Sequence, residues 1–422
     1  LANSMRWICV LEFLYKFVCI ANCIVMAQIP YIFNQLVSHI PKDVFDRLVK
    51  KYRGNFHIKK FSCWNHLLLM IWAQLTSRKS LRDIETSLRA HADKVYRMGI
   101  GSEISRNAIA NANAKRDVAI YRELAQGMML LACKINVKDE LLQMISKQFQ
   151  LNGFFAIDST TVSLDLRKFT WSVPQEEWGG VKLHTMYDLL RMVPRMCLIT
   201  GHEERDQTFM EDYPYEANCF YMFDKMYLKT RGLNCVELAN AYFVTRLKKN
   251  MVYETLESSV AVSNRILEDS TIRFTSRWAR EGYPKPLRKI CYYSSEKNEV
   301  IVFLTNNFVL EAATIALLYQ YRWQIELFFK WIKQHLKIES FYGTSANAVM
   351  IQIYTAVVSY CLLAICADSV KFNGSLYEFA NLISVSLTEK IYLVDLIKRY
   401  YKQPSVNEKY YELPIFDFSN LQ

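Results

Sequence analysis

Apolar residues recur at helical spacing through the first part of the chain, from about Ile29 to Asn136. Val44 to Tyr52 is amphipathic and basic, and Trp64 to Leu75 is almost entirely apolar. Ser80 is a suitable N-cap for the helix that follows it. Ser105 opens a further helix that we expect to run to about Arg122. The pattern therefore predicts a helical domain at residues 26–140.

Beyond Gly153 the period changes to that of β-strands. Asp158 ends a short apolar run and Asp224 ends another. Strands separated by helical segments predict an α/β fold with a mixed sheet. The predicted strands begin with the apolar run at 154–157, which the alternating stretch 160–166 follows, and continue at 181–187, 193–200, 219–223 and 241–247.

The rest of the chain adds a β-rich stretch and a long helix. Further strands are predicted at 272–275, 288–294 and 300–304, which makes residues 250–307 a β-rich insertion within a domain that spans 150–400. A single helix is expected from about Leu310 to Leu336. Residues 403–422 form an irregular tail.

Two apolar stretches resemble membrane segments. Glu12 interrupts the first, and we expect residues 1–25 to be an upstream extension outside the fold, with translation starting at Met26. Ser345 to Ala367 has no charge and is long enough to cross a bilayer. Polar residues such as Gln352 recur through it, which favours a helix buried in a large core over a membrane span.

The composition excludes several protein classes. Hydrophobic residues make up 51% of the 422 residues and charged residues 22%, which excludes collagen and wholesale disorder. The 11 cysteines include no Cys-x-x-Cys pair, so a zinc site and a disulfide scaffold are both disfavoured. Lys and Arg number 52 against 41 Asp and Glu. This excess of basic residues favours a polyanionic partner, nucleic acid before anionic membrane.

One predicted helix carries an unusual polar stripe. Tyr319, Arg322, Glu326, Lys330 and Lys333 fall at offsets of 0, 3, 7, 11 and 14, which places them on one helix face. A solvated face would mix acidic and basic residues evenly, whereas here a lone carboxylate lies among cations. The opposite face is apolar and contains Leu317, Ile325, Phe328, Ile332 and Leu336.

Three carboxylates are candidates for one site. Asp158 and Asp224 each follow an apolar strand, and the carboxyl ends of strands in an open α/β sheet are where ligands bind. For either residue alone, a turn-forming Asp is the alternative. Together with Glu326 they could hold two divalent cations, and ligands that are all oxygen favour Mg²⁺ or Mn²⁺. Such a pair suits in-line displacement at phosphorus.

At this point the chain resembles a known family. The spacing of Tyr319, Arg322, Glu326 and Lys333 is similar to the signature of DDE transposases of the insertion sequence 4 family. The resemblance covers about residues 26–390 and includes Ser80-Leu81-Arg82-Asp83-Ile84-Glu85 and Ala156-Ile157-Asp158-Ser159-Thr160-Thr161.

The resemblance implies a ribonuclease-H-like catalytic core with a β-rich insertion, preceded by a helical DNA-binding domain. It implies that Asp158, Asp224 and Glu326 are the catalytic, metal-binding triad for two Mg²⁺ ions. The activity implied is binding of the inverted ends of an insertion sequence, followed by metal-dependent cleavage and strand transfer. The implied partners are double-stranded DNA and a second copy of the chain, in a bacterial cytoplasm beside the nucleoid and without a membrane.

The resemblance also implies DNA contacts. Tyr319, Arg322 and Lys333 would contact phosphates at the transposon ends, with Lys330 on the same face. Trp323 would stack on a displaced base, with core packing as the alternative. Apart from the resemblance, three further basic residues on or after predicted strands are candidates for DNA binding, namely Lys182, Arg246 and Lys248. For each of them the alternative is a solvated charge.

Two features depart from the family pattern. Members commonly have Asp-Arg-Gly-Tyr after the fourth strand, whereas this chain reads Asp224-Lys225-Met226-Tyr227. The Met side chain is either tolerated or crowds the backbone beside a metal ligand. Asp206 is a rival second carboxylate. Three other functions stay open, namely a degenerate relative that binds DNA without cutting it, a nuclease without strand transfer, and a membrane protein.

Overall fold

A computed structural model describes residues 31–101, 104–165, 167–169, 171, 178–201, 210–211, 213–260, 265–296, 298–335 and 340–402. The expected upstream extension at 1–25, the irregular tail at 403–422 and the rival carboxylate Asp206 lie outside these ranges.

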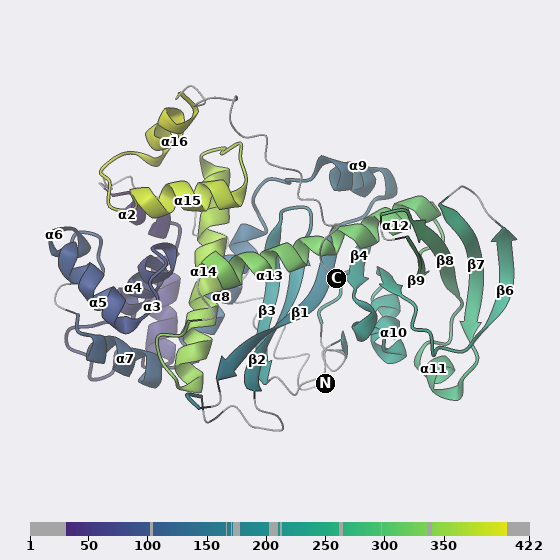
Figure 1. Ribbon diagram of the computed structural model, residues 1–422, viewed down its shortest axis with the longest axis horizontal. Coiled ribbons are helices and arrows are strands. Elements are labelled where there is room, and N and C mark those ends of the chain that lie inside the picture. Colours follow the sequence, from purple (N-terminus) through teal and green to yellow (C-terminus); the bar gives the residue numbers. More distant parts are fainter. Residues whose placement is uncertain are drawn as a thin grey trace.

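The first part of the chain is helical, as its periodicity predicts (Figure 1). The apolar stretch predicted at 64–75 is α4, and the side chains of Ser62 and Asn65 cap its start reciprocally. Ser80 caps the next helix by accepting from the backbone N–H of Asp83. The helices are α2 (Ile32–Val37), α3 (Lys42–Lys51), α4 (Cys63–Leu75), α5 (Leu81–Ala90), α6 (Ala92–Val95), α7 (Arg106–Lys115), α8 (Val118–Ala132) and α9 (Glu140–Phe149).

The helix expected from Ser105 to Arg122 is wrong as a single element. It ends at Lys115, and the backbone of Arg116 is extended, with ψ of 139°. Asp117 then starts α8 by accepting a hydrogen bond at Oδ1 from the backbone N–H of Ala119. The helical period records only the spacing of apolar residues, which continues across the break. The break is marked instead by a single polar residue, because a capping aspartate stabilises a new helix start.

The strands of the described chain form one sheet in the order β3-β2-β1-β4-β5-β9-β8-β7-β6. β1 pairs antiparallel with β2, and β2 with β3, whereas β4 runs parallel to β1 and β5 parallel to β4. The strands are β1 (Gly153–Asp165), β2 (Trp178–Asp188), β3 (Val193–Gly201), β4 (Cys219–Phe223), β5 (Tyr242–Arg246), β6 (Tyr253–Val260), β7 (Ile266–Phe274), β8 (Leu287–Ser294) and β9 (Glu299–Thr305).

The β-rich stretch extends this sheet instead of forming a second one. β9 joins it to β5, with Val244 opposite Thr305. The three strands predicted there coincide with parts of β7, β8 and β9, and the first extends one residue past the end of β7. β6 was not predicted, because it is an exposed edge strand whose polar residues, among them Glu254 and Glu257, give no hydrophobic alternation.

The remaining elements lie on the faces and ends of the sheet. α14 runs between α2–α7, which gather at one end of the molecule, and the sheet, whose β6–β9 edge forms the other end (Figure 1). These elements are η2 (Lys225–Tyr227), α10 (Thr230–Leu238), α11 (Arg277–Gly282), α12 (Ala312–Tyr321), α13 (Trp323–His335), α14 (Ala346–Ser369), α15 (Leu376–Ser386) and α16 (Leu393–Lys402).

The long apolar helix predicted at 345–367 is α14, and it is a core helix. It is long and apolar enough to cross a bilayer, but 89% of its most apolar window is buried inside the protein. Its polar side chains are satisfied internally. Gln352 accepts from the backbone N–H of Tyr342 at 2.8 Å and donates to the carbonyl of Ser340 at 2.9 Å, and Ser359 donates to Gln74 Oε1 at 3.1 Å.

We expect Gln352→Leu to destabilise the protein by about 1–3 kcal/mol, because the buried N–H of Tyr342 and the carbonyl of Ser340 lose their partner. The measurement is urea-induced unfolding followed by circular dichroism. Gln320→Leu, at an exposed position of α12, is the matched control and should leave the midpoint almost unchanged. Equal midpoints for the two variants would contradict this account of α14.

Candidate active site

Parallel pairing brings two of the predicted carboxylates to the same place. The last paired residues of β1 and β4 are Ile157 and Phe223, so Asp158 and Asp224 follow at equivalent positions. Asp224 directly follows β4, as predicted. Asp158 does not end its strand, because β1 continues to Asp165 as a hairpin with β2. The expectation of two strand ends was therefore wrong for Asp158, since only its parallel partner ends there.

Both aspartates lie on the sheet face that α13 covers. Side chains alternate along a strand, and the even-numbered residues Ala156 and Met222 belong to the same core as Ile325 of α13. The even-numbered Asp158 and Asp224 share that side. Burial of the apolar face of α13 thus sets which side chains the helix presents to the aspartates.

The single long helix predicted at 310–336 is divided at Arg322. The N–H of Arg322 bonds to the carbonyl of Tyr319, and that of Ile325 to the carbonyl of Arg322, so both bonds span three residues instead of four. This tighter turn separates α12 from α13. Of the predicted apolar face, Ile325, Phe328 and Ile332 are buried, Leu317 is only partly buried, and Leu336 lies outside the described residues.

Arg322 joins the third carboxylate to the first. Its Nη1 donates to Asp158 Oδ2 at 2.8 Å and its Nη2 donates to Glu326 Oε1 at 2.6 Å. The side chains of Arg322 and Asp158 are 14% and 18% exposed, so solvent screens this ion pair only weakly. One guanidinium therefore holds β1 and α13 together at the site.

The charged form of Asp158 is disfavoured in this arrangement. Its pKa is raised to about 6, chiefly by burial. The charge of Arg322 and the N–H of Ser159 oppose this rise, whereas the negative charges of Asp224 and Glu326 add to it. The charges of all three carboxylates are therefore coupled at this site.

Tyr319 and Arg246 form a second layer beside Arg322. Tyr319 is buried, with its ring centroid 4.9 Å from that of Phe303. The guanidinium carbons of Arg246 and Arg322 lie 5.6 and 5.8 Å from the centre of the Tyr319 ring. The ring of Tyr319 thus contacts both guanidinium groups and helps to fix their positions. The role of Tyr319 and Arg246 in DNA binding stays a prediction.

The rest of α13 offers exposed groups to solvent. Trp323 is 57% exposed, so the alternative that it packs in the core is wrong. Lys330 is exposed as well. Lys333 donates from Nζ to the carbonyl of Thr161 at 2.8 Å and so lies along β1 beyond Asp158. These three residues and Arg322 follow one side of α13.

The last two predicted DNA-binding lysines differ in position. Lys248 donates to the carbonyl of Leu228 at 3.2 Å and lies close enough to Asp224 for that charge to oppose the lowering of its pKa by burial. Lys182 is paired with Thr161 across the β1–β2 hairpin, on the face opposite to Leu183 and the α13 core. The structure therefore does not bring Lys182 to the carboxylates.

Met226 does not crowd the site. Its side chain is 55% exposed, and its backbone N–H donates to Asp224 Oδ2 at 3.0 Å. It is absent from the described non-glycine residues that have positive φ, so the position does not require the conformational freedom of glycine. The departure from the family pattern at this position is tolerated by the backbone.

The carboxylates fit a divalent cation in donor type and in charge. All their donor atoms are oxygen, and Arg322 bridges two of the three, Asp158 and Glu326. As they stand, however, no three His, Cys, Asp or Glu side chains of the described chain converge closely enough to hold a metal. Arg322 occupies one oxygen each of Asp158 and Glu326.

Comparison with known families decides the identity of the chain. Residues 150–362 match the model of the transposase DDE domain, and residues 30–101 match a domain of unknown function, DUF4372. The chain belongs to the DDE transposase family. Its sequence resemblance to insertion-sequence transposases is thereby confirmed.

Similar proteins are also transposases by name. A transposase named y4zB from Sinorhizobium fredii is 33% identical over 67% of this chain and 77% of its own length. The transposase of insertion sequence element IS4SA from Synechocystis is 25% identical over 84% of this chain and 97% of its own length. A solved piggyBac transposase synaptic complex with hairpin DNA aligns with a TM-score of 0.37 at 10% identity, over 91% of this chain and 84% of that one. That structural likeness is too low to bear on the fold.

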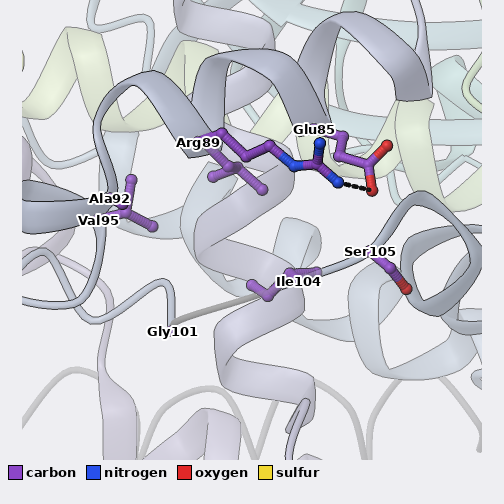
Figure 2. Close-up of a pocket in the computed structure, with 8 residues that line it drawn as sticks. Glu85, Arg89, Ala92, Val95, Gly101, Ile104 and Ser105 are labelled. Atoms are coloured by element: carbon purple, nitrogen blue, oxygen red, sulfur yellow. Dashed lines mark ion pairs between the residues drawn. The ribbon is translucent and has the colours of Figure 1, made fainter.

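The DUF4372 segment of this transposase contains a shallow hollow of about 400 Å³. Figure 2 shows the ion pair of Glu85 and Arg89 among the residues that line the hollow, with the apolar side chains of Val95 and Ile104 nearby. Arg89 Nη2 lies 3.5 Å from Glu85 Oε1. The hollow is distant in sequence from the carboxylates and contributes no residue to them.

We expect Asp158→Asn to stabilise the transposase at neutral pH. Because the folded-state pKa of Asp158 is raised to about 6, the folded state holds the proton more tightly than the unfolded chain, so stability falls as pH rises from about 4 to 6. The substitution removes this fall in the free energy of unfolding, which amounts to about 1–3 kcal/mol above pH 6.

The measurement is urea unfolding of DNA-free protein in a chelator, at several pH values. The difference between variant and wild type should grow from pH 4 to 6 and then level off. A variant that is less stable than the wild type at neutral pH would show that the Arg322 ion pair outweighs the burial of Asp158.

Proposed function

We propose that this protein binds the inverted ends of an insertion sequence and catalyses metal-dependent DNA cleavage and strand transfer. The observation that carries the proposal is the group of Asp158, Asp224 and Glu326, which comes from two parallel strands and a helix and whose charges act together on Asp158. Arg322 links Asp158 to Glu326. Buried carboxylates with coupled charges are typical of catalytic sites.

The first five strands support a ribonuclease-H-like core. Their order is β3-β2-β1-β4-β5, with β2 antiparallel to its neighbours and β4 and β5 parallel to β1. In this arrangement β1 and β4 are adjacent, which brings Asp158 next to Asp224. The β6–β9 strands are then an insertion between the second aspartate and Glu326.

Asp158, Asp224 and Glu326 would hold the Mg²⁺ or Mn²⁺ ions. Divalent cations bound there would supply the Lewis acid that activates the attacking oxygen and stabilises the leaving one. Arg322 occupies oxygens of Asp158 and Glu326. A cation and this guanidinium therefore compete for the same atoms.

Two displacements at phosphorus make up the reaction. In the first, a water oxygen attacks the phosphodiester at the element boundary, and the bond from phosphorus to the 3′ oxygen breaks. The products are a 3′-hydroxyl on the element strand and a 5′-phosphate on the flanking strand. In the second, this 3′-hydroxyl attacks a target phosphodiester and displaces the 3′ oxygen of the target strand. Each step exchanges one phosphorus–oxygen bond for another, and neither needs a redox partner.

The cationic residues of the site would hold the DNA backbone. Lys330, Lys333 and Arg322 follow one side of α13, and Arg246 lies behind Tyr319 on the same sheet face. Phosphate contacts of this kind position a duplex without reading its sequence. The exposed Trp323 is available to stack on a base that leaves the helix. We further propose a dimer that bridges two transposon ends in the bacterial cytoplasm.

Glu326→Gln should abolish cleavage while leaving DNA binding intact. The amide keeps the shape of the side chain but removes the charge that a divalent cation needs. The experiment mixes the protein with duplex DNA that carries the genomic flanks of the gene and Mg²⁺, and resolves nicked products on a gel. Glu311→Gln, an exposed position just before α12, is the matched control. Nicking by Glu326→Gln at the wild-type rate would remove Glu326 from the proposed triad.

Strand transfer separates a transposase from a simple nuclease and from a degenerate copy. We expect a precleaved end with a free 3′-hydroxyl to become joined to plasmid DNA, and the same end with a 3′-deoxy terminus to remain unjoined. The readout is the appearance of labelled end DNA in the plasmid band. Cleavage without joining would favour the nuclease, and binding without either reaction would favour a degenerate copy.

A further inference from the structure

The oxygens of Asp158 are both engaged by hydrogen-bond donors of the protein itself. Oδ2 accepts from Arg322 Nη1 at 2.8 Å, and Oδ1 accepts from the backbone N–H of Ser159 at 2.8 Å. The second terminal nitrogen of Arg322 is 2.6 Å from Glu326 Oε1. A divalent cation needs these carboxylate oxygens as its own ligands. Of the two donors on Asp158, only Arg322 is a side chain, so it can leave without a change in the backbone.

The guanidinium of Arg322 is less firmly held than that of a structural arginine in the same protein. Arg288 donates to both oxygens of Asp269 and also to two backbone carbonyls between β9 and α12. Among the described residues, the hydrogen bonds of the Arg322 guanidinium to oxygen are those to the two carboxylates. Its other support is the ring of Tyr319, 5.8 Å from the guanidinium carbon. An anion that replaces the carboxylates would therefore cost Arg322 no backbone contact.

The ion pair of Arg322 and Glu326 lies at the side of α13 that we propose to face DNA. The side chain of Glu326 is 32% exposed and that of Arg322 is 14% exposed, so solvent reaches the pair from the Glu326 end. Trp323 and Lys330 are exposed on the same helix. A DNA phosphate there would attract the guanidinium, because the planar fork of an arginine pairs with phosphate as well as with carboxylate.

We propose that Arg322 is a displaceable counter-ion that makes divalent-cation binding depend on DNA binding. Without DNA, the guanidinium stays on Asp158 and Glu326 and keeps the affinity for a cation low. A backbone phosphate that pairs with the guanidinium releases these oxygens for the cation. The inference rests on the proposed function, because it takes the carboxylates as cation ligands and DNA as substrate. It adds that the two ligands bind cooperatively, so that the complete catalytic site forms on DNA.

Cooperativity of this kind is reciprocal. If DNA raises the affinity for the cation by some factor, the cation must raise the affinity for DNA by the same factor. Coupling factors between two sites are typically about 5 to 150. The proposal can therefore be tested by binding alone, from the side of either ligand and without a measurement of cleavage.

The first test measures Mn²⁺ binding to the DNA-free protein at about pH 8, with free Mn²⁺ counted by electron paramagnetic resonance. Arg322→Met keeps the length of the side chain and removes the guanidinium. We expect the Kd for Mn²⁺ to fall at least about tenfold. A purely structural role predicts the opposite sign, because carboxylates that lose their anchor would hold Mn²⁺ more weakly. A Kd equal to or above that of the wild type overturns the proposal.

Arg246→Met is the matched control for net charge. The guanidinium carbon of Arg246 lies 5.6 Å from the centre of the same Tyr319 ring, but its ion pair, of 3.6 Å, is with Glu299. This variant removes one positive charge from the same layer without freeing an oxygen of Asp158. We expect its Kd for Mn²⁺ to stay within about threefold of the wild type, because salt screens the more distant charge. Equal tightening in both variants overturns the proposal.

Arg322→Lys keeps a positive charge beside the buried Asp158, so it decides the question if Arg322→Met does not fold. An ammonium is a point charge and lacks the planar fork that spans two carboxylates. We expect Mn²⁺ to bind this variant more tightly than the wild type, by a smaller factor than in Arg322→Met. A Kd for Mn²⁺ that is no lower than in the wild type overturns the proposal.

The second test adds DNA. The duplex carries the precleaved element end with a 3′-deoxy terminus, which cannot be joined, so that binding is measured without strand transfer. The ratio of its Kd without Mn²⁺ to its Kd with Mn²⁺ is the coupling factor. We expect this factor to be at least about fivefold larger for the wild type than for Arg322→Met, which has no guanidinium to release. Equal factors for the two proteins overturn the proposal.

Failure of this inference is distinguishable from failure of the proposed function. If the wild type cleaves its duplex in Mn²⁺, while Arg322→Met binds Mn²⁺ no more tightly than the wild type, the counter-ion role fails and the function stands. If the wild type does not cleave the duplex and binds no Mn²⁺ with or without it, both fail.

Discussion

Burial of α14 is the constraint on which the rest of this transposase depends. The helix is 24 residues long and apolar around its whole circumference, so water cannot be left on any side of it. α4, α7 and α8 cover it from the N-terminal part, and β3 and α13 cover it from the sheet. One hydrophobic core therefore runs from the first helices to the α13 face of the sheet, through residues such as Leu69, Val357 and Phe328.

That shared core positions the carboxylates of the candidate site. α13 packs its apolar side, with Ile325 and Phe328, against the same face of the sheet from which Asp158 emerges. Its polar side therefore faces the aspartate. Arg322 offsets the repulsion between the negative charges of Asp158 and Glu326 by forming an ion pair with each. The arrangement costs stability, because burial holds the pKa of Asp158 high. Such strain is expected where negative charge is gathered to hold a cation.

Packing fixes the positions of arginines in two parts of this architecture. Beside the carboxylates, Arg246 and Arg322 flank the buried ring of Tyr319, so their positions are fixed by packing. Arg116 occupies the break between α7 and α8, where its extended backbone brings the guanidinium to the carbonyl of Phe61 in the α3–α4 loop.

The sequence by itself determined the local elements and the identity of the candidate residues. Helical spacing and capping residues located α4, α5 and α14, and the spacing from Tyr319 to Lys333 identified the family. These features are local, because a period or a cap is encoded within a few residues of itself.

Only the tertiary structure decided which residues meet. Parallel pairing placed Asp158 beside Asp224 although β1 continues past the site, and the register of the β1–β2 hairpin put Lys182 on the other face. The break at Arg322 and the burial of Arg116 depend on partners far along the chain, Asp158 and Phe61. A hydrophobic pattern records how often a side chain turns inward, but not which distant strand or helix it will face.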